Sequence, residues 1–88
     1  MRTPTETLDF VTALLINDLN MLTVKLNRGI ARTMDDTDKI LLVIEITFKD
    51  ISKSNWLNAL DTELRGFLQG QDFLITGGGE NTLVIILV

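Results

Sequence analysis

Two apolar segments, residues 40–44 and 82–88, constrain the fold of this chain most, because neither alternates between apolar and polar residues. Successive side chains of a strand point to opposite faces of a sheet, so a strand with one wet face alternates. Apolar residues at both parities indicate that both faces of the sheet are covered. An 88-residue chain forms one domain, residues 1–88, and has few residues left to cover a second face of the sheet. We therefore expect self-association or a partner to supply part of the cover.

The N-terminal segment has the pattern of an amphipathic helix. Thr3 can cap it, Pro4 suits the first helical position, and Glu6 can complete a capping box. Its apolar stripe recurs every three or four residues, at Leu8, Val11, Leu15 and Leu19. Residues 21–27 fit two interpretations, a continued helical stripe or an alternating strand. We favour the strand, because β-branched residues prefer it and the helix would be very long.

The rest of the chain indicates one more helix and three more strands. Residues 28–39, with a glycine and several aspartates, have the composition of a connecting loop before a strand over residues 40–49. A second helix follows, capped by Ser52 or Ser54 and ended by Gly70. Its apolar stripe is Leu57, Leu60, Leu64 and Leu68. Residues 73–76 and 82–88 then form a hairpin around the turn 77–81.

These elements predict an α+β fold: two α-β-β units forming a four-stranded, mainly antiparallel sheet with both helices on one face. A shift of 49 residues superimposes a cap, an apolar stripe, a strand and a glycine of the two halves. An internal repeat of residues 3–48 and 52–88 is one interpretation. The other is that any two amphipathic helices followed by strands can be aligned in this way.

The composition argues against an enzyme. The chain has no cysteine, histidine or tyrosine, which excludes disulfides and zinc–cysteine sites and removes the usual general base near neutral pH. The carboxylates Asp35, Asp36 and Asp38 lack the spacing of an EF-hand loop. Gly77, Gly78 and Gly79 are followed by Glu80 and Asn81, not by the lysine of a phosphate-binding loop. We predict no catalytic residue, no cofactor and no metal ion.

Charge and hydropathy narrow the set of partners. Eight basic and twelve acidic residues are scattered along the chain and give a net charge of −4, which disfavours nucleic acid. No apolar run approaches the length of about 20 residues that spans a membrane. No signal sequence opens the chain, so a cytoplasmic location is expected.

The sheet face away from the helices is the candidate interface. Leu41, Val43 and Leu74 are expected there with one parity of the last strand. The candidate residues from that strand are Val84, Ile86 and Val88, and the alternative set is Leu83, Ile85 and Leu87. The apolar area of such a patch exceeds the area that a monomer normally exposes. We therefore predict a homodimer.

The chain is accordingly expected to be a non-enzymatic interaction or assembly module that acts as a homo-oligomer on a protein partner. Two loops would meet that partner, through Arg28 and Arg32 in one and Gly77, Gly78, Gly79 and Glu80 in the other. The small size and the absence of catalytic motifs suit a phage or plasmid accessory protein that inhibits or adapts a host machine. The alternative is a small-ligand or nucleotide-binding protein, with a pocket at the dimer seam closed by residues 77–79.

Overall fold

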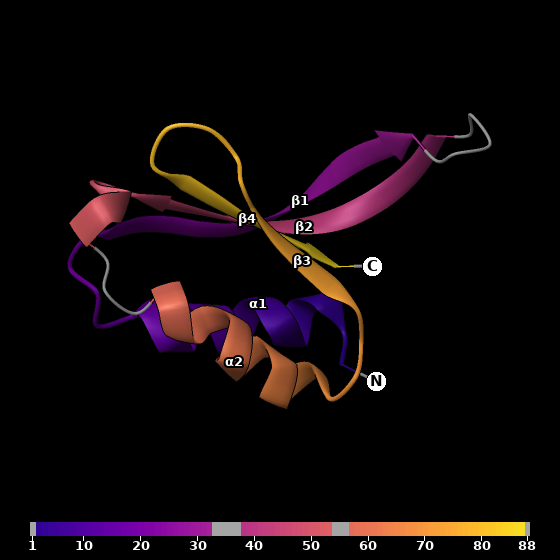
Figure 1. The fold of residues 1–88 in the computed structure, drawn as a ribbon, viewed down its shortest axis with the longest axis horizontal. Helices are drawn as coiled ribbons and strands as arrows, with labels where there is room; N and C mark the ends of the chain where they lie inside the picture. The colour runs from indigo at the N-terminus through magenta and orange to yellow at the C-terminus, as the bar shows by residue number, and fades with distance from the viewer. Residues whose placement is uncertain (1, 33–37, 54–56, 88) are drawn as a thin grey trace.

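The computed structural model describes residues 2–32, 38–53 and 57–87, which form an α+β fold (Figure 1). Both helices lie on one face of a four-stranded antiparallel sheet with strand order β1-β2-β4-β3. The chain runs through α1 (Pro4–Leu15), β1 (Met21–Arg32), β2 (Asp38–Phe48), a short 3-10 turn η1 (Ile51–Lys53), α2 (Leu57–Leu68), β3 (Phe73–Gly77) and β4 (Thr82–Leu87). The predicted fold class is confirmed.

Helix α1 begins as predicted and ends earlier than predicted. The Thr3 hydroxyl accepts a hydrogen bond from the Glu6 amide at 3.1 Å, and the Glu6 carboxylate accepts one from the Thr3 amide at 3.1 Å. The helix stops at Leu15, so the prediction that Leu19 belongs to its stripe is wrong: Leu19 is 91% exposed. The physical reason is the Asp18 carboxylate, which accepts from the Asn20 amide at 2.9 Å and stabilises a turn in place of another helical turn.

Strand β1 is confirmed over residues 21–27, but the predicted loop is wrong for residues 28–32 and 38–39, which belong to strands; residues 33–37 lie outside the described residues. Arg28 pairs with Leu42, Gly29 pairs with Leu41, and the pairing continues to Arg32 opposite Asp38. Gly29 fits an extended strand, because a Cβ there would lie at an ordinary 3.5 Å from Val43 Cγ1. Strand β4 pairs with β2 only as far as Leu42. Residues 28–32 and 38–41 therefore form a two-stranded extension, called the arm below, that projects beyond the sheet (Figure 1).

The start of helix α2 also differs from the prediction. It begins at Leu57, and Ser52 lies in η1, where its amide and hydroxyl donate to the Asp50 carboxylate at 3.1 and 2.7 Å. Ser52 is therefore not the helix cap, and Ser54 lies outside the described residues. The helix ends at Leu68, before Gln69 and Gly70 with φ of 46° and 92°, as the predicted glycine terminator requires.

The core lies between the helices and one face of the sheet. Ile44 and Ile46 of β2 face it, and Ile85 of β4 pairs directly with Ile44. The helices contribute residues at every fourth position. The buried helical residues are Thr7, Val11 and Leu15 of α1 and Leu60, Leu64 and Leu68 of α2. These positions correspond at a shift of 53 residues, whereas the sequence alignment used 49. Whether the two units arose by duplication stays a prediction.

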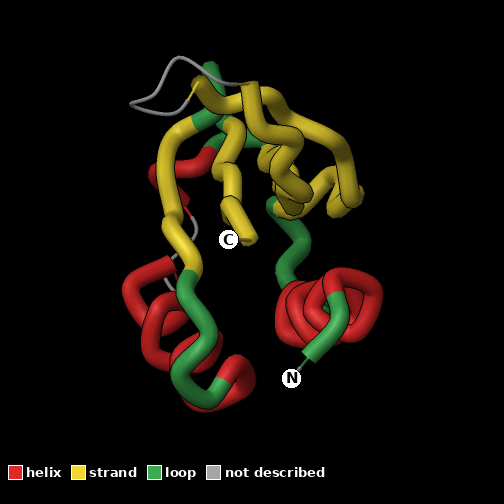
Figure 2. Tube along the Cα trace, turned by 90° about the vertical axis from the view of Figure 1, so that its right-hand side faces the viewer, coloured by secondary structure: helices red, strands yellow, loops and turns green. Residues whose placement is uncertain are grey.

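The sheet is strongly twisted, which places its corners at different heights. Figures 1 and 2 show that the arm and the β3–β4 turn both rise away from the helices. The starts of β1 and β3 bend the other way, toward the helices that precede them (Figure 1). A right-handed twist lifts diagonally opposite corners to the same side, and here those corners are the two hairpin ends.

Two leucine substitutions test this division into core and surface. Leu64 is fully buried, so we expect Leu64→Ala to lower the free energy of unfolding by about 2–5 kcal/mol. Leu19→Ala, the same change at an exposed site, should change it by less than about 0.5 kcal/mol. Urea unfolding followed by circular dichroism measures both. Equal losses for the two variants would contradict the core assignment.

Candidate functional site

The candidate site is the sheet face away from the helices, called the outer face below. Cross-strand pairing places Val43 beside Ile86 and Ile86 beside Leu74, and the next row places Glu45 beside Val84. Because Ile85 is buried against the helices, the alternation of β4 assigns Val84 and Ile86 to the outer face. The predicted residues Leu41, Val43, Leu74, Val84 and Ile86 therefore share one face. Val88 lies outside the described residues.

The exposure of this face is uneven. Leu74, on the edge strand β3, is 56% exposed, whereas Val43, on the central strand β2, is only 8% exposed. Leu41, Val84 and Ile86 are half-buried. Both helices of the described ranges lie on the other face of the sheet (Figure 1), and the glycine turn contributes to the burial of Val84 by packing Gly78 against it. The apolar patch, which consists of Leu41, Val43, Leu74, Val84 and Ile86, is thus exposed to solvent chiefly at the β3 edge.

The polar part of the outer face lies toward β1. Lys25 Nζ is 3.8 Å from Glu45 Oε2, and the two side chains are 58% and 32% exposed. An exposed ion pair of this kind contributes about 0–1 kcal/mol to stability. Three threonines, Thr23, Thr47 and Thr82, form the next row. Glu45, which interrupts the apolar pattern of the sequence, thus marks the border between the apolar patch and this polar strip.

The glycine turn folds back onto the outer face. Gly77 ends β3, and the Gly78 amide donates to the Thr82 carbonyl at 3.0 Å. A Cβ on Gly78 would lie 2.2 Å from Val84 Cγ2, so no side chain fits there. Gly79 has a φ of 122°, which other residues rarely adopt. Gly78 and Gly79 therefore each occupy a position that requires a glycine.

Asn81 and Asn20 fix the base of this turn to its neighbours. Asn81 Oδ1 accepts from the Ile51 amide at 3.0 Å, and the Asn81 carbonyl accepts from the Phe48 amide at 2.8 Å. Asn20 Oδ1 accepts from the Asp50 amide at 2.9 Å, and its side-chain amide donates to the Asp50 carbonyl. The α1–β1, β2–α2 and β3–β4 connections are thereby joined at one corner of the sheet.

The two predicted partner loops do not form one site. Arg28 is exposed on β1 where the arm begins, and Arg32 is in the arm, paired with Asp38 through the backbone; the Arg32 side chain is outside the described part. The turn with Gly77, Gly78, Gly79 and Glu80 lies at the diagonally opposite corner (Figure 1). Antiparallel pairing of β2 with β4 makes this separation necessary, because it points the two hairpins in opposite directions.

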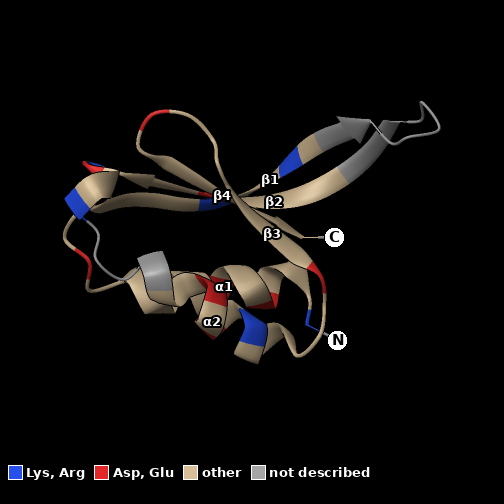
Figure 3. Ribbon diagram, in the orientation of Figure 1, with Lys and Arg blue, Asp and Glu red and all other residues tan. Residues whose placement is uncertain are grey.

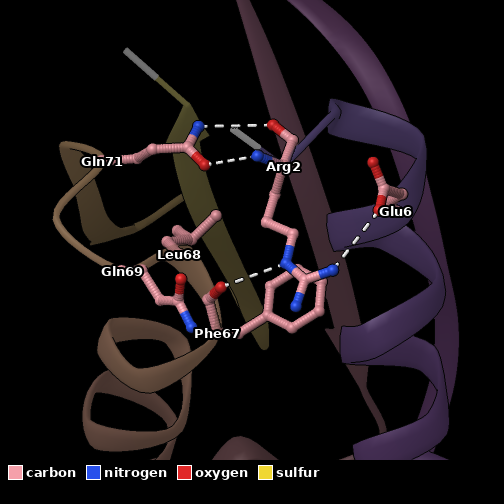
Figure 4. A pocket seen from close by; sticks show the side chains of 6 residues that line it. All are labelled: Arg2, Glu6, Phe67, Leu68, Gln69 and Gln71. Atoms are coloured by element: carbon pink, nitrogen blue, oxygen red, sulfur yellow. Dashed lines mark hydrogen bonds and ion pairs between the residues drawn. The ribbon is translucent and has the colours of Figure 1, made fainter.

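Sequence reasoning missed a pocket of about 250 Å³ between the chain start and the end of α2 (Figure 4). The Arg2 guanidinium lies 4.5 Å from the centre of the Phe67 ring and 3.5 Å from the Glu6 carboxylate. Phe67 also stacks on Phe10 at 4.1 Å between ring centres. The Arg2 amide donates to the Gln71 side chain at 2.6 Å. These partners are up to 69 residues apart, so no local pattern could indicate them.

The pocket has the features of a structural contact. Its polar groups satisfy one another: Gln71 Nε2 donates to the Arg2 carbonyl at 3.3 Å, and Arg2 Nε donates to the Phe67 carbonyl at 3.4 Å. It lies in the helical layer, away from the glycine turn (Figures 1 and 4). The predicted ligand pocket beside residues 77–79 is therefore a different place. These contacts hold the start of α1 against the connection between α2 and β3.

Comparisons with protein-family models, with curated proteins and with solved structures found no match for this chain. Neither helix of the described ranges is long and apolar enough to cross a membrane. Within the same ranges, no three acidic side chains gather where a metal ion could bind. Asp35 and Asp36 lie outside these ranges.

The contact between the glycine turn and Val84 generates a prediction. Gly78→Ala should lower the free energy of unfolding by about 1–3 kcal/mol, because the stiff, β-branched Val84 must move. Gly77→Ala, with open space at its Cβ, is the matched control and should change stability by less than about 0.5 kcal/mol. Thermal unfolding of both variants measures this. The second change Val84→Ala should recover part of the loss, and no recovery would contradict the contact.

The capping box generates a prediction about pH. The hydrogen bonds that Glu6 accepts from Thr3 hold the pKa of its carboxyl below the ordinary 4.5, with a smaller effect from Arg2. A carboxyl with a lowered folded-state pKa stabilises the fold above about pH 4.5, and this stabilisation is lost as pH falls through the folded-state value. Carbon-detected NMR titration should find the Glu6 pKa below 4.5. Thr3→Val removes the hydroxyl and keeps the backbone amide, so it should raise the Glu6 pKa only in part; an unchanged value would exclude a contribution from the Thr3 hydroxyl.

Proposed function

We propose that this chain is a non-enzymatic interaction module that assembles as a homodimer through its outer face. The carrying observation is the row formed by Val43, Ile86 and Leu74, three apolar side chains adjacent across three strands on the face away from both described helices, with Leu74 at 56% the most open to solvent. Burial of apolar surface stabilises association by about 25 cal/mol per Å², before the cost of association is subtracted. A second copy packed on this face would cover the apolar residues of β2 and β4 that point away from the helices, as the apolar sequence of both strands predicts.

Two further observations support the proposal. Leu74 is a large apolar residue 56% exposed at the open side of the patch, where a monomer gains nothing from leaving it in water. Among the outer-face residues whose side chains the structure describes, the charged ones are Lys25 and Glu45, which pair with each other, so this part of the face brings no excess charge into an interface; Lys39 has the same parity, and its side chain lies outside the described part. The two raised hairpins border this face, and the parts of them that the second copy leaves exposed would be available for contact with a further protein.

The experiment is analytical ultracentrifugation of the wild type and of Leu74→Lys. We expect a wild-type dimer at tens of micromolar. Leu74→Lys should raise the dimer dissociation constant at least about ten-fold, because a charge would be placed in an apolar seam. The exposed position of Leu74 lets the lysine remain hydrated in the monomer, so the fold should survive.

The matched control is Ala13→Lys, the same gain of charge at an exposed position of α1. It should leave the dissociation constant unchanged. A monomeric wild type at these concentrations would refute the proposal, and so would equal weakening by the two lysine variants. Circular dichroism verifies that both variants are folded.

A further inference from the structure

The charges at the two edges of the sheet point to the arrangement of the dimer. We infer that the second copy packs on the outer face about a two-fold axis parallel to the strands, so that β1 of each copy lies opposite β3 of its partner. This inference rests on the proposed function and adds the orientation of the two copies. It assigns a contact between Lys25 of one copy and Glu80 of the partner subunit.

The two sheet edges carry opposite charge. Strand β1 holds Lys25, Arg28 and Arg32 and no acidic residue. From Gly66 to the end of the chain there is no basic residue, and the two charged residues, Asp72 and Glu80, flank β3. Figure 3 shows the basic colour on β1 and the acidic colour on the β3–β4 turn and before β3. Cross-strand pairing places Arg28 beside Leu42, at the core-face parity, and Arg32 opposite Asp38, so the outer side has one described basic residue at the β1 edge, Lys25, and an acidic residue, Glu80, beyond the β3 edge.

The direction of the axis follows from this division. A two-fold axis parallel to the strands, between β2 and β4, exchanges the two edges and places each basic edge over an acidic one. A two-fold axis perpendicular to the strands within the plane places β1 over β1 and brings like charges together. Opposite potentials across an interface favour correct orientation, and like charges oppose it. The edge charges therefore select the axis parallel to the strands.

The strand register brings Lys25 near Glu80 of the partner subunit in this arrangement. Lys25, Glu45, Val84 and Thr76 form one row across the sheet, so Lys25 lies opposite Thr76 of the partner subunit. The turn with Glu80 follows directly after Thr76 and Gly77 and rises on the outer side (Figure 1). Both side chains are exposed, and Lys25, which lies 3.8 Å from Glu45 of its own copy, would gain Glu80 of the partner subunit as a second acidic neighbour.

Shape agrees with this axis. A twisted sheet is a saddle, and here the raised corners are the arm and the β3–β4 turn (Figures 1 and 2). Rotating a saddle about a line parallel to its strands gives a second saddle of the same curvature, so the two faces follow each other. Aligned packing of twisted sheets has this origin. The raised turn of one copy then meets the lowered start of the partner's β1.

A charge-swap experiment tests the arrangement. Glu80→Lys and Lys25→Glu should each weaken the homodimer about ten-fold, since each creates two repulsive contacts per dimer. Mixed in equal amounts, the two variants should form the heterodimer in preference to either homodimer, because both contacts become attractive. Native mass spectrometry of one isotope-labelled and one unlabelled variant measures the proportions. The preference should fall in high salt.

The control pairs Lys25→Glu with Glu63→Lys, which makes the same charge change on the exposed surface of α2. This mixture should show no preference for the heterodimer. A statistical distribution for the Glu80→Lys and Lys25→Glu mixture, with an intact wild-type dimer, would overturn the arrangement and leave the proposed function standing. A monomeric wild type would overturn both.

Discussion

The structure depends on the pairing of Ile44 with Ile85 at the centre of the sheet. This pair sets the alternation of both middle strands: their core-facing residues pack on the two helices, and their other residues, including Val43 and Ile86, face away. Two helices of twelve residues each cover one face of four strands, and the chain has no third helix in its described ranges for the other. The apolar character of both faces of β2 and β4 therefore leads directly to the proposed assembly.

Twist gives this one-sided arrangement its functional geometry. The strand starts that follow the helices bend down toward them, and the hairpin ends rise on the open side (Figure 1). Contacts at the base of the β3–β4 turn, through Asn20 and Asn81, fix one of these raised ends. The same twist makes the outer face a saddle, which a second copy matches in shape. The packing of both helices on one face, the fixed β3–β4 turn and the charges at the sheet edges all support the proposed position of a partner on the outer face.

Local signals predicted the elements well where the chemistry is local. The capping box at Thr3, the apolar stripes apart from Leu19 and the apolar strand ending at Phe48 each depend on residues a few positions apart, and the structure has them. The prediction failed where distant pairing decides. Gly29 and the charged residues Arg32 and Asp38 have the composition of a loop, yet pairing between β1 and β2 holds them in extended strands. Pairing with the neighbouring strands also decides which residues of β4 face away from the helices. The apolar run alone could therefore not tell whether Val84 or Leu83 faces outward.

We propose that a second copy covers the outer face in solution. Isotope-filtered NMR on a mixture of labelled and unlabelled chains detects contacts between copies, separately from those within one copy. We predict intermolecular NOEs from the methyl groups of Leu74, Val84 and Ile86. Intermolecular NOEs confined to helix residues such as Ala13, or none at all at millimolar concentration, would contradict it.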